Sequence, residues 1–220
     1  IVGESWLDKE TLRPVICTED AKMPGIPTPA QLMVSTIGDE LKVATDGSAK
    51  VFSIAPTVDA AILAAGHAAD GAFWIDDKSG LWTGSKYYSR EIPGFIQIFN
   101  ELQSPSAKIG KLIWQPATEV SGTFNYYQHI GDQKPFNHVF KGERKFIEYK
   151  TCGLINADIT ELARQCVTSQ TLGYDRVTDL LCLTYYAGNF DHQVMTDCQM
   201  ELQDTYLRLD RELGKLIKAL

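Results

Sequence analysis

The stretch that most constrains the fold runs from Thr178 to Leu213. Residues 178–186 contain the continuous apolar run LLCL, which predicts a central strand covered on both faces. A polar turn, GNFDHQ at residues 188–193, follows this strand. In α/β proteins ligands lie outside the carboxyl ends of the strands, so this turn is the first place to look for chemistry.

Apolar residues recur every three or four positions after the turn, which predicts a long amphipathic helix. The predicted apolar stripe of this helix consists of Leu202, Tyr206, Leu209, Leu213, Leu216, Ile217 and Leu220.

The rest of the chain also alternates between predicted helices and predicted strands. Thr28 and Pro29 have the residue types of a helix start, which predicts a helix over 28–45. A further helix is predicted to begin at Asn156 or Asp158 and to end at Gly173. The other predicted elements are a strand at 50–55, a small-residue helical turn at 59–66, a hairpin of 72–75 with 81–83, and a helix at 93–102.

The composition indicates a folded chain, with 44% hydrophobic and 22% charged residues in 220. A net charge of -7 without a basic block argues against a nucleic-acid partner. No apolar run approaches the ~20 residues of a transmembrane helix. We expect a single α/β domain over 1–220, in which the aperiodic, aromatic-rich segment 87–150 forms a cap.

The ends of the sequence lead us to expect an internal piece of a longer protein. Ile1 is not an initiator Met, and Leu220 stops inside an apolar helical pattern. The five cysteines are an odd number without a CxxC pair, so we expect structural thiols.

The residues alone offer one candidate constellation, in which Asp191 and His192 stand near Asn189, Asp197 and Cys198. Zinc requires three or four converging nitrogen, sulfur or carboxylate ligands, and here only two are plausible. The alternative is a solvated turn that caps the next helix.

No other motif points to chemistry. Ser53 and Thr57 lack a GxSxG context, and the lone His67 after an alanine-rich turn has the pattern of a structural histidine. The chain has no Walker A motif, no GxGxxG and no HExxH.

Several segments together resemble the alkaline phosphatase superfamily, specifically its type I phosphodiesterase/nucleotide pyrophosphatase branch and the related single-chain bacterial alkaline phosphatases. These segments are IVGESW (1–6), VICTED (15–20), IGDELKVAT (37–45), SAKVFSIA (48–55), AAILAAGHAADGAFWIDD (60–77), TSQTLGYDRVTDLL (168–181) and LQDTYLRLDREL (202–213). The resemblance implies a mostly parallel sheet flanked by helices, with a smaller irregular cap. It also implies an exported, metal-dependent phosphoester hydrolase.

The family's chemistry uses two zinc ions and a Thr or Ser nucleophile. The resemblance places the nucleophile and the last zinc ligands outside these 220 residues, so we expect no cofactor in this chain by itself. The family's zinc-binding Asp and His, four residues apart, fall on Asn189 and Gln193. Both ligands have become amides, which are poor zinc ligands, and Asp191 and His192 are the candidate substitutes.

A second departure follows the predicted strand at 50–55. Related phosphatases carry Lys-x-Arg there to stabilise the transferring phosphoryl group, whereas this chain has Thr57-Val58-Asp59. Thr57 and Asp59 therefore mark lost phosphate contacts, although diesterase members also lack that pair.

These departures favour a binding or regulatory relative without two-zinc catalysis, whose ligand is an unknown small molecule or protein. The alternatives are a divergent metal-dependent phosphodiesterase or phosphatase active only in the full-length protein, and a structural protein-interaction domain.

Overall fold

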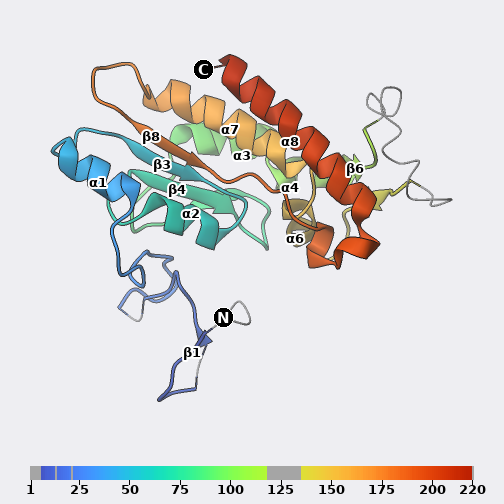
Figure 1. Ribbon diagram of the computed structural model, residues 1–220, viewed down its shortest axis with the longest axis horizontal. Helices are drawn as coiled ribbons and strands as arrows, with labels where there is room; N and C mark the ends of the chain where they lie inside the picture. Colours follow the sequence, from blue (N-terminus) through green and yellow to red (C-terminus); the bar gives the residue numbers. More distant parts are fainter. Residues whose placement is uncertain (1–5, 13, 21, 118–134, 220) are drawn as a thin grey trace.

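The computed structural model describes residues 6–12, 14–20, 22–117 and 135–219. Its centre is a four-stranded sheet in the order β5-β4-β3-β8, shown in Figure 1. β3 (Val51–Ile54) runs parallel to β4 (Gly71–Ile75) and to β8 (Leu180–Leu183), and β5 (Trp82–Gly84) is antiparallel to β4. The predicted mostly parallel α/β fold is confirmed.

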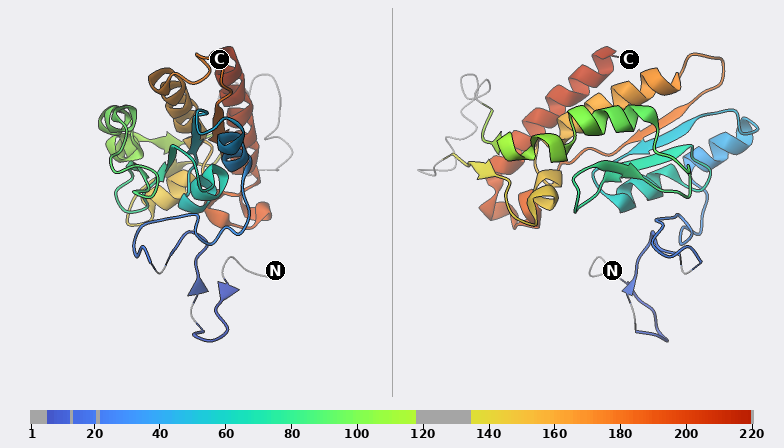
Figure 2. Two further views of the ribbon diagram at one scale, coloured as in Figure 1. Left: turned by 90° about the vertical axis from the view of Figure 1, so that its left-hand side faces the viewer. Right: turned by 180° about the vertical axis from the view of Figure 1, so that it is seen from behind.

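Helices cover both faces of this sheet (Figure 2). α3 (Gly94–Leu102) and α7 (Ile155–Gln170) lie on one face, and α1 (Ile37–Ala44) and α2 (Val58–Ala65) lie on the other. α8 (Gln199–Ala219) packs on α7. Each strand contributes side chains to both helix layers, because successive side chains of a strand point to opposite faces of the sheet.

The alternation produces two apolar cores. Phe52 and Ile54 of β3 belong to the core under α3 and α7, whereas Val51 and Ala55 belong to the smaller core under α2. Continuous burial of β3 and β4 explains why their sequences are apolar without alternation.

Several short elements lie outside the four-stranded sheet and its helices. They are β1 (Trp6–Leu7), β2 (Pro14–Val15), α4 (Pro105–Lys108), η1 (Ile109–Lys111), β6 (Ile113–Trp114), β7 (His138–Val139), α6 (Lys145–Lys150), η3 (Phe190–His192) and η4 (Met195–Asp197). Phe95, Trp114 and Tyr149 from the region 87–150 share the larger core with the sheet. Part of that region, 118–134, lies outside the described residues. The cap and domain boundaries stay predictions.

The predicted helix at 28–45 is largely wrong. α1 begins at Ile37 behind a capping box, in which Thr36 Oγ1 accepts from Asp39 N and Asp39 Oδ2 accepts from Thr36 N. Thr28 Oγ1 does accept from Ala30 N, but only a turn follows. The reason is that Met33 is 91% exposed, so no apolar stripe anchors a helix there.

The predicted cap of α7 is also wrong. Asn156 and Asp158 lie inside the helix, which begins at Ile155. Asn156 instead bonds the backbone after β8: Tyr186 N donates to its Oδ1 at 2.8 Å, and its Nδ2 donates to Tyr186 O at 2.9 Å. Asn156 therefore binds the backbone of a distant segment instead of capping its own helix.

The third correction concerns the stretch 178–213. Among the described residues β8 is an edge strand, and its four residues are only half-buried. α8 turns a polar stripe inward, with Glu201, Asp204 and Glu212 buried. Part of the predicted apolar stripe faces solvent, since Tyr206 is 54% and Ile217 is 74% exposed.

The hairpin, α2 and α3 form where the sequence predicted them. All five cysteines are free thiols, and Cys152, Cys166 and Cys198 are buried. Among the described helices none is both long enough and apolar enough to cross a bilayer.

Candidate functional site

A pocket of about 730 Å³ opens at the carboxyl ends of β3 and β4. Pro56 follows β3, and the chain then enters α2 through Thr57 as the N-cap residue. The lining residues are Gly25, Ile26, Pro27, Thr57, Val58, Asp59, Trp74, Ile75, Asp76, Asp77, Lys78, Thr83, Gly84, Lys86 and Lys150. We call this the strand-end pocket.

The pocket holds three carboxylates and three lysines. Lys150 is buried and forms an ion pair with the exposed Asp77. Asp76 Oδ2 accepts from Ser79 N and Ser79 Oγ, both at 2.7 Å. The hydrogen bond from the Ser79 backbone is the main cause that lowers the pKa of Asp76, so this carboxylate serves the turn between β4 and β5.

Both sequence-predicted phosphate positions line the strand-end pocket. The Thr57 side chain is exposed and makes no capping hydrogen bond. Asp59 lies in the first turn of α2, where its Oδ1 accepts from Thr18 Oγ1 at 3.0 Å. A carboxylate at a helix N-terminus occupies the place that an anionic ligand would otherwise find attractive.

The predicted metal positions lie in the turn after β8, and their side chains bond within it. Asn189 Nδ2 donates to the Gln193 backbone oxygen at 3.0 Å. The Tyr186 hydroxyl donates to the Asn189 carbonyl. Phe190 between them is buried against His138 and Trp114, with ring centroids 4.3 Å and 5.3 Å away.

Asp191 and His192 do not converge on a common centre with these amides. Asp191 Oδ1 accepts from Arg144 Nη2 at 2.6 Å, and Asp191 N donates to Thr151 Oγ1 at 3.0 Å. His192 is exposed, and both residues have positive φ, 46° and 56°.

The donor set of the turn does not fit zinc. It offers two amides, one carboxylate paired with Arg144, and one exposed imidazole. Within the described ranges no group of three or more His, Cys, Asp or Glu side chains is placed to hold a metal. The expectation that this chain by itself takes no cofactor stays a prediction.

α6 connects the turn to the strand-end pocket. Lys150 ends α6 and lines the pocket, and the next residue, Thr151, accepts the hydrogen bond from Asp191 N. The structure therefore brings the two sequence-predicted sites to consecutive residues at one helix end, Lys150 and Thr151.

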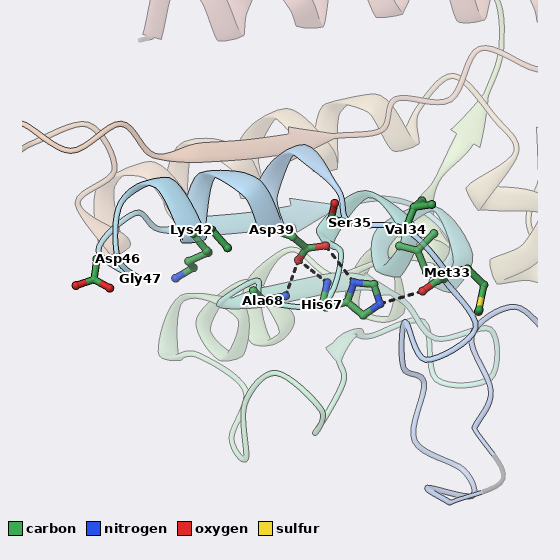
Figure 3. Close-up of a pocket in the computed structure, with 11 residues that line it drawn as sticks. Met33, Val34, Ser35, Asp39, Lys42, Asp46, Gly47, His67 and Ala68 are labelled. Atoms are coloured by element: carbon green, nitrogen blue, oxygen red, sulfur yellow. Dashed lines mark hydrogen bonds and ion pairs between the residues drawn. The ribbon is translucent and has the colours of Figure 1, made fainter.

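The sequence predicted a structural role for His67, but it did not reveal Asp39 as the partner of the ring. His67 Nδ1 lies 3.0 Å from Asp39 Oδ2, and Nε2 lies 3.1 Å from the Leu32 carbonyl oxygen. Figure 3 shows the His67 ring pointing toward the Asp39 carboxylate. Asp39 also accepts from the backbone nitrogens of His67 and Ala68. The spacing Thr36-x-x-Asp39 was the available signal, because it is that of a capping box.

Segment 22–34, which we call the strap, runs from the strand-end pocket to His67. Gly25, Ile26 and Pro27 form part of the pocket wall, and the Leu32 carbonyl meets the His67 ring. Ser85 Oγ donates to the Pro27 carbonyl, which fixes the wall end of the strap.

Known proteins resemble the chain over nearly its whole length. Alkaline phosphatase PhoV from Synechococcus elongatus is 30% identical over 235 residues, which are 97% of this chain and 42% of PhoV. Alkaline phosphatase PafA from Elizabethkingia meningoseptica is 29% identical over 240 residues, covering 100% of this chain and 44% of PafA. A calcium-transporting ATPase from Myroides odoratus is 28% identical over 245 residues, with coverages of 100% and 44%. No protein-family model matches the chain.

The solved structures agree with these relatives. The crystal structure of wild-type PafA superposes with a TM-score of 0.80 at 28% identity, covering 99% of this chain and 46% of PafA. A PafA mutant gives a TM-score of 0.78 at 26% identity, with coverages of 98% and 46%. The chain spans less than half the length of the relatives it matches.

Proposed function

The chain belongs to the alkaline phosphatase superfamily, and we propose that it is a phosphoester-hydrolase-like domain that binds a ligand without two-zinc catalysis. The ligand site in this proposal is the strand-end pocket. The protein then acts as a binding or regulatory relative of the phosphatases. Export from the cytoplasm and a bacterial source belong to the same proposal.

The observation that carries the proposal is the hydrogen bond from Asn189 Nδ2 to the Gln193 carbonyl. The two positions at which the family resemblance expects a zinc carboxylate and a zinc imidazole are amides, and one amide is used inside the turn. An amide oxygen is a weaker zinc ligand than a carboxylate, and Gln offers no imidazole nitrogen.

Asp59, which lines the strand-end pocket, is a second observation that supports the absence of two-zinc catalysis. Phosphoryl transfer requires cations or hydrogen-bond donors directed at the phosphoryl oxygens. Here a carboxylate stands in the first turn of α2 and accepts a hydrogen bond from Thr18. It repels a phosphate dianion instead of holding it.

The strand-end pocket retains the features of a small-molecule site. Its volume of about 730 Å³ lies within the usual range for ligand pockets, roughly 300–1,000 Å³. Apolar walls from Trp74 and Ile75 meet the polar side chains of Thr57 and Lys86. This mixture suits a ligand with both apolar and polar parts.

The test uses the intact protein, loaded with zinc and then freed of excess metal. We expect no turnover of nitrophenyl phosphate and less than two bound zincs by elemental analysis. Thermal shifts with inorganic phosphate and with adenosine monophosphate then probe the pocket, and Trp74→Ala is the matched pocket variant. Two stoichiometric zincs together with turnover of nitrophenyl phosphate would overturn the proposal.

A divergent metal-dependent hydrolase is the second candidate. It is favoured by one observation, the exposed His192 beside Asp191 at the end of the turn. In that case both residues hold metal together with groups supplied by other parts of a longer protein.

A further inference from the structure

The His67 ring lies between two hydrogen-bond acceptors. Nδ1 faces the Asp39 carboxylate at 3.0 Å, and Nε2 faces the Leu32 backbone carbonyl at 3.1 Å. A carboxylate and a carbonyl oxygen can only accept hydrogen bonds. Both contacts are therefore made only when each ring nitrogen carries a hydrogen, which is the imidazolium form.

Asp39 stays an anion throughout the physiological range. Burial alone would raise the pKa of Asp39, but the hydrogen bonds from Thr36, the His67 side chain and Ala68 outweigh it and lower the pKa to about 2. The ring thus keeps its bond to Asp39 whenever it has one proton to donate. The proton on Nε2 is the one that it can lose.

The backbone around the ring is held in place, so the ring cannot follow a moving strap. Gly66 has a φ of 77°, and a Cβ there would lie 2.2 Å from Thr36 Oγ1. The Tyr88 hydroxyl donates to the Gly66 carbonyl at 2.7 Å, and the Tyr87 hydroxyl donates to the His67 carbonyl at 3.2 Å. Burial raises the pKa of Tyr88, so this hydroxyl remains a donor.

The charged neighbours of the ring do not supply a competing switch. Lys42 and Asp46 line the same open groove from α1 and the loop after it. Lys42 forms an ion pair with Asp70 at 2.7 Å, and Asp46 is exposed. The strap contributes Leu32, Met33 and Val34 to the groove, and Ser35 follows it; none of these side chains is charged.

Few apolar contacts hold the strap near His67. Met33 is 91% and Val34 is 68% exposed, so the hydrogen bond to the Leu32 carbonyl is a main tie at this end. At the other end the strap is tied by the Ser85 hydroxyl to the Pro27 carbonyl, and by Thr28 N to the Thr18 carbonyl at 2.8 Å. These two ties are made by groups that do not titrate near neutral pH.

We propose that His67 is a pH-dependent latch, which holds the strap while its ring is protonated and releases it when the ring becomes neutral. On release, the Nε2 proton passes to solvent, which the 38% exposed side chain allows. The remaining Nε2 lone pair then faces the Leu32 carbonyl and repels it. The latch therefore opens as the pH rises and the ring loses its second proton.

When the latch opens, the strap keeps its two ties beside the strand-end pocket, so the freed part is the stretch around Leu32, and an effect on the wall of Gly25, Ile26 and Pro27 is transmitted only along the strap. This consequence rests on the proposed function of that pocket. The latch itself does not, since it can be observed without a ligand.

The experiment follows two quantities by NMR on one ligand-free sample from pH 5 to 8.5. One is the titration of the His67 ring, and the other is the exchange protection of the Leu32 amide, which donates to Pro29 O. We expect its protection factor to fall about tenfold, with the same midpoint as the ring, while the Thr28 amide, tied to Thr18 O, keeps its protection. The Asp70 amide, which donates to Val51 O at 2.8 Å in the sheet region, is the internal reference and should not change.

His67→Gln should abolish the step, and His192→Gln, at an exposed histidine, should retain it. Constant protection of the Leu32 amide across the ring titration of the unaltered protein would overturn the latch, even if His67→Gln fails to fold. An unchanged step in a folded His67→Gln protein would also overturn it. Absence of ligand binding would contradict the proposed function and leave the latch standing.

Discussion

The Trp114 indole nitrogen donates a 2.6 Å hydrogen bond to Asp204 Oδ2, which ties β6 to the inward face of α8. Asp204 is fully buried and also accepts from Ala117 N at 2.9 Å and from Arg208 Nε at 2.6 Å. A buried carboxylate with these partners links β6 and Ala117, within the segment 87–150, to α8.

Asp204→Ala should lower the free energy of unfolding by about 3 kcal/mol, because it leaves the indole and the Ala117 amide unpaired beside an uncompensated Arg208. Urea unfolding followed by circular dichroism measures this loss. The control is Asp210→Ala at an exposed position of the same helix, which should cost less than about 0.5 kcal/mol. Equal effects of the two substitutions would refute the assigned role of Asp204.

Acid should remove the stability that Asp39 provides. Its pKa is lowered to about 2 in the folded chain, so the unfolded chain binds this proton at a higher pH. The contribution is complete above about pH 4 and is lost as the pH falls toward 2, with a size of at most about 2 kcal/mol. Comparing the unfolding free energies of the unaltered chain and Asp39→Asn across that range should show the difference between them shrinking toward acid.

Two isoleucines give a direct test of the unexpected orientation of α8. Ile159→Ala in the buried face of α7 should cost about 2–5 kcal/mol, as expected for a fully buried side chain. Ile217→Ala should cost less than about 1 kcal/mol, because that side chain is 74% exposed. Similar losses in denaturant unfolding at both positions would mean that the stripe of α8 is buried after all.

Asp191→Ala and His192→Ala separate the two functional candidates. If the turn is not a metal site, neither change should alter the zinc content or the phosphoester turnover of the intact protein. Asp191→Ala should cost at most about 1 kcal/mol, since Arg144 in this ion pair is 60% exposed. Loss of bound zinc or of measurable turnover in either variant favours the divergent hydrolase.

Local patterns predicted the elements whose ends are set locally. Pro56 stops β3, a polar turn joins β4 to β5, and Pro93 precedes α3, so these boundaries follow from short-range chemistry. The misplaced start of α1 shows the limit of such reasoning, because Thr28-Pro29 and Thr36-x-x-Asp39 are both plausible caps. Only the tertiary bonds of Asp39 to the His67 loop favour the second.

The site was predictable in position but not in detail. The rule that ligands lie at the carboxyl ends of strands located both Thr57 and the turn at 188–193. The sequence could not reveal that the end of α6 contacts both of them, since Lys150 and Thr151 contact residues 73 and 40 positions away. Nor could it reveal Arg144 as the partner of Asp191, because the two residues lie 47 positions apart in the chain.

The outer edge of β8 has a practical consequence for anyone who handles the chain. Residues 180–186, LLCLTYY, contain no charge, proline or glycine, and the strand has a neighbour on one side only among the described elements. Unpaired amides and carbonyls beside such side chains are a template for intermolecular strand addition and amyloid-type aggregation. Cys182→Lys, at a half-buried position outside both apolar cores, would act as a gatekeeper against self-association, and the shelf life of concentrated samples should lengthen accordingly.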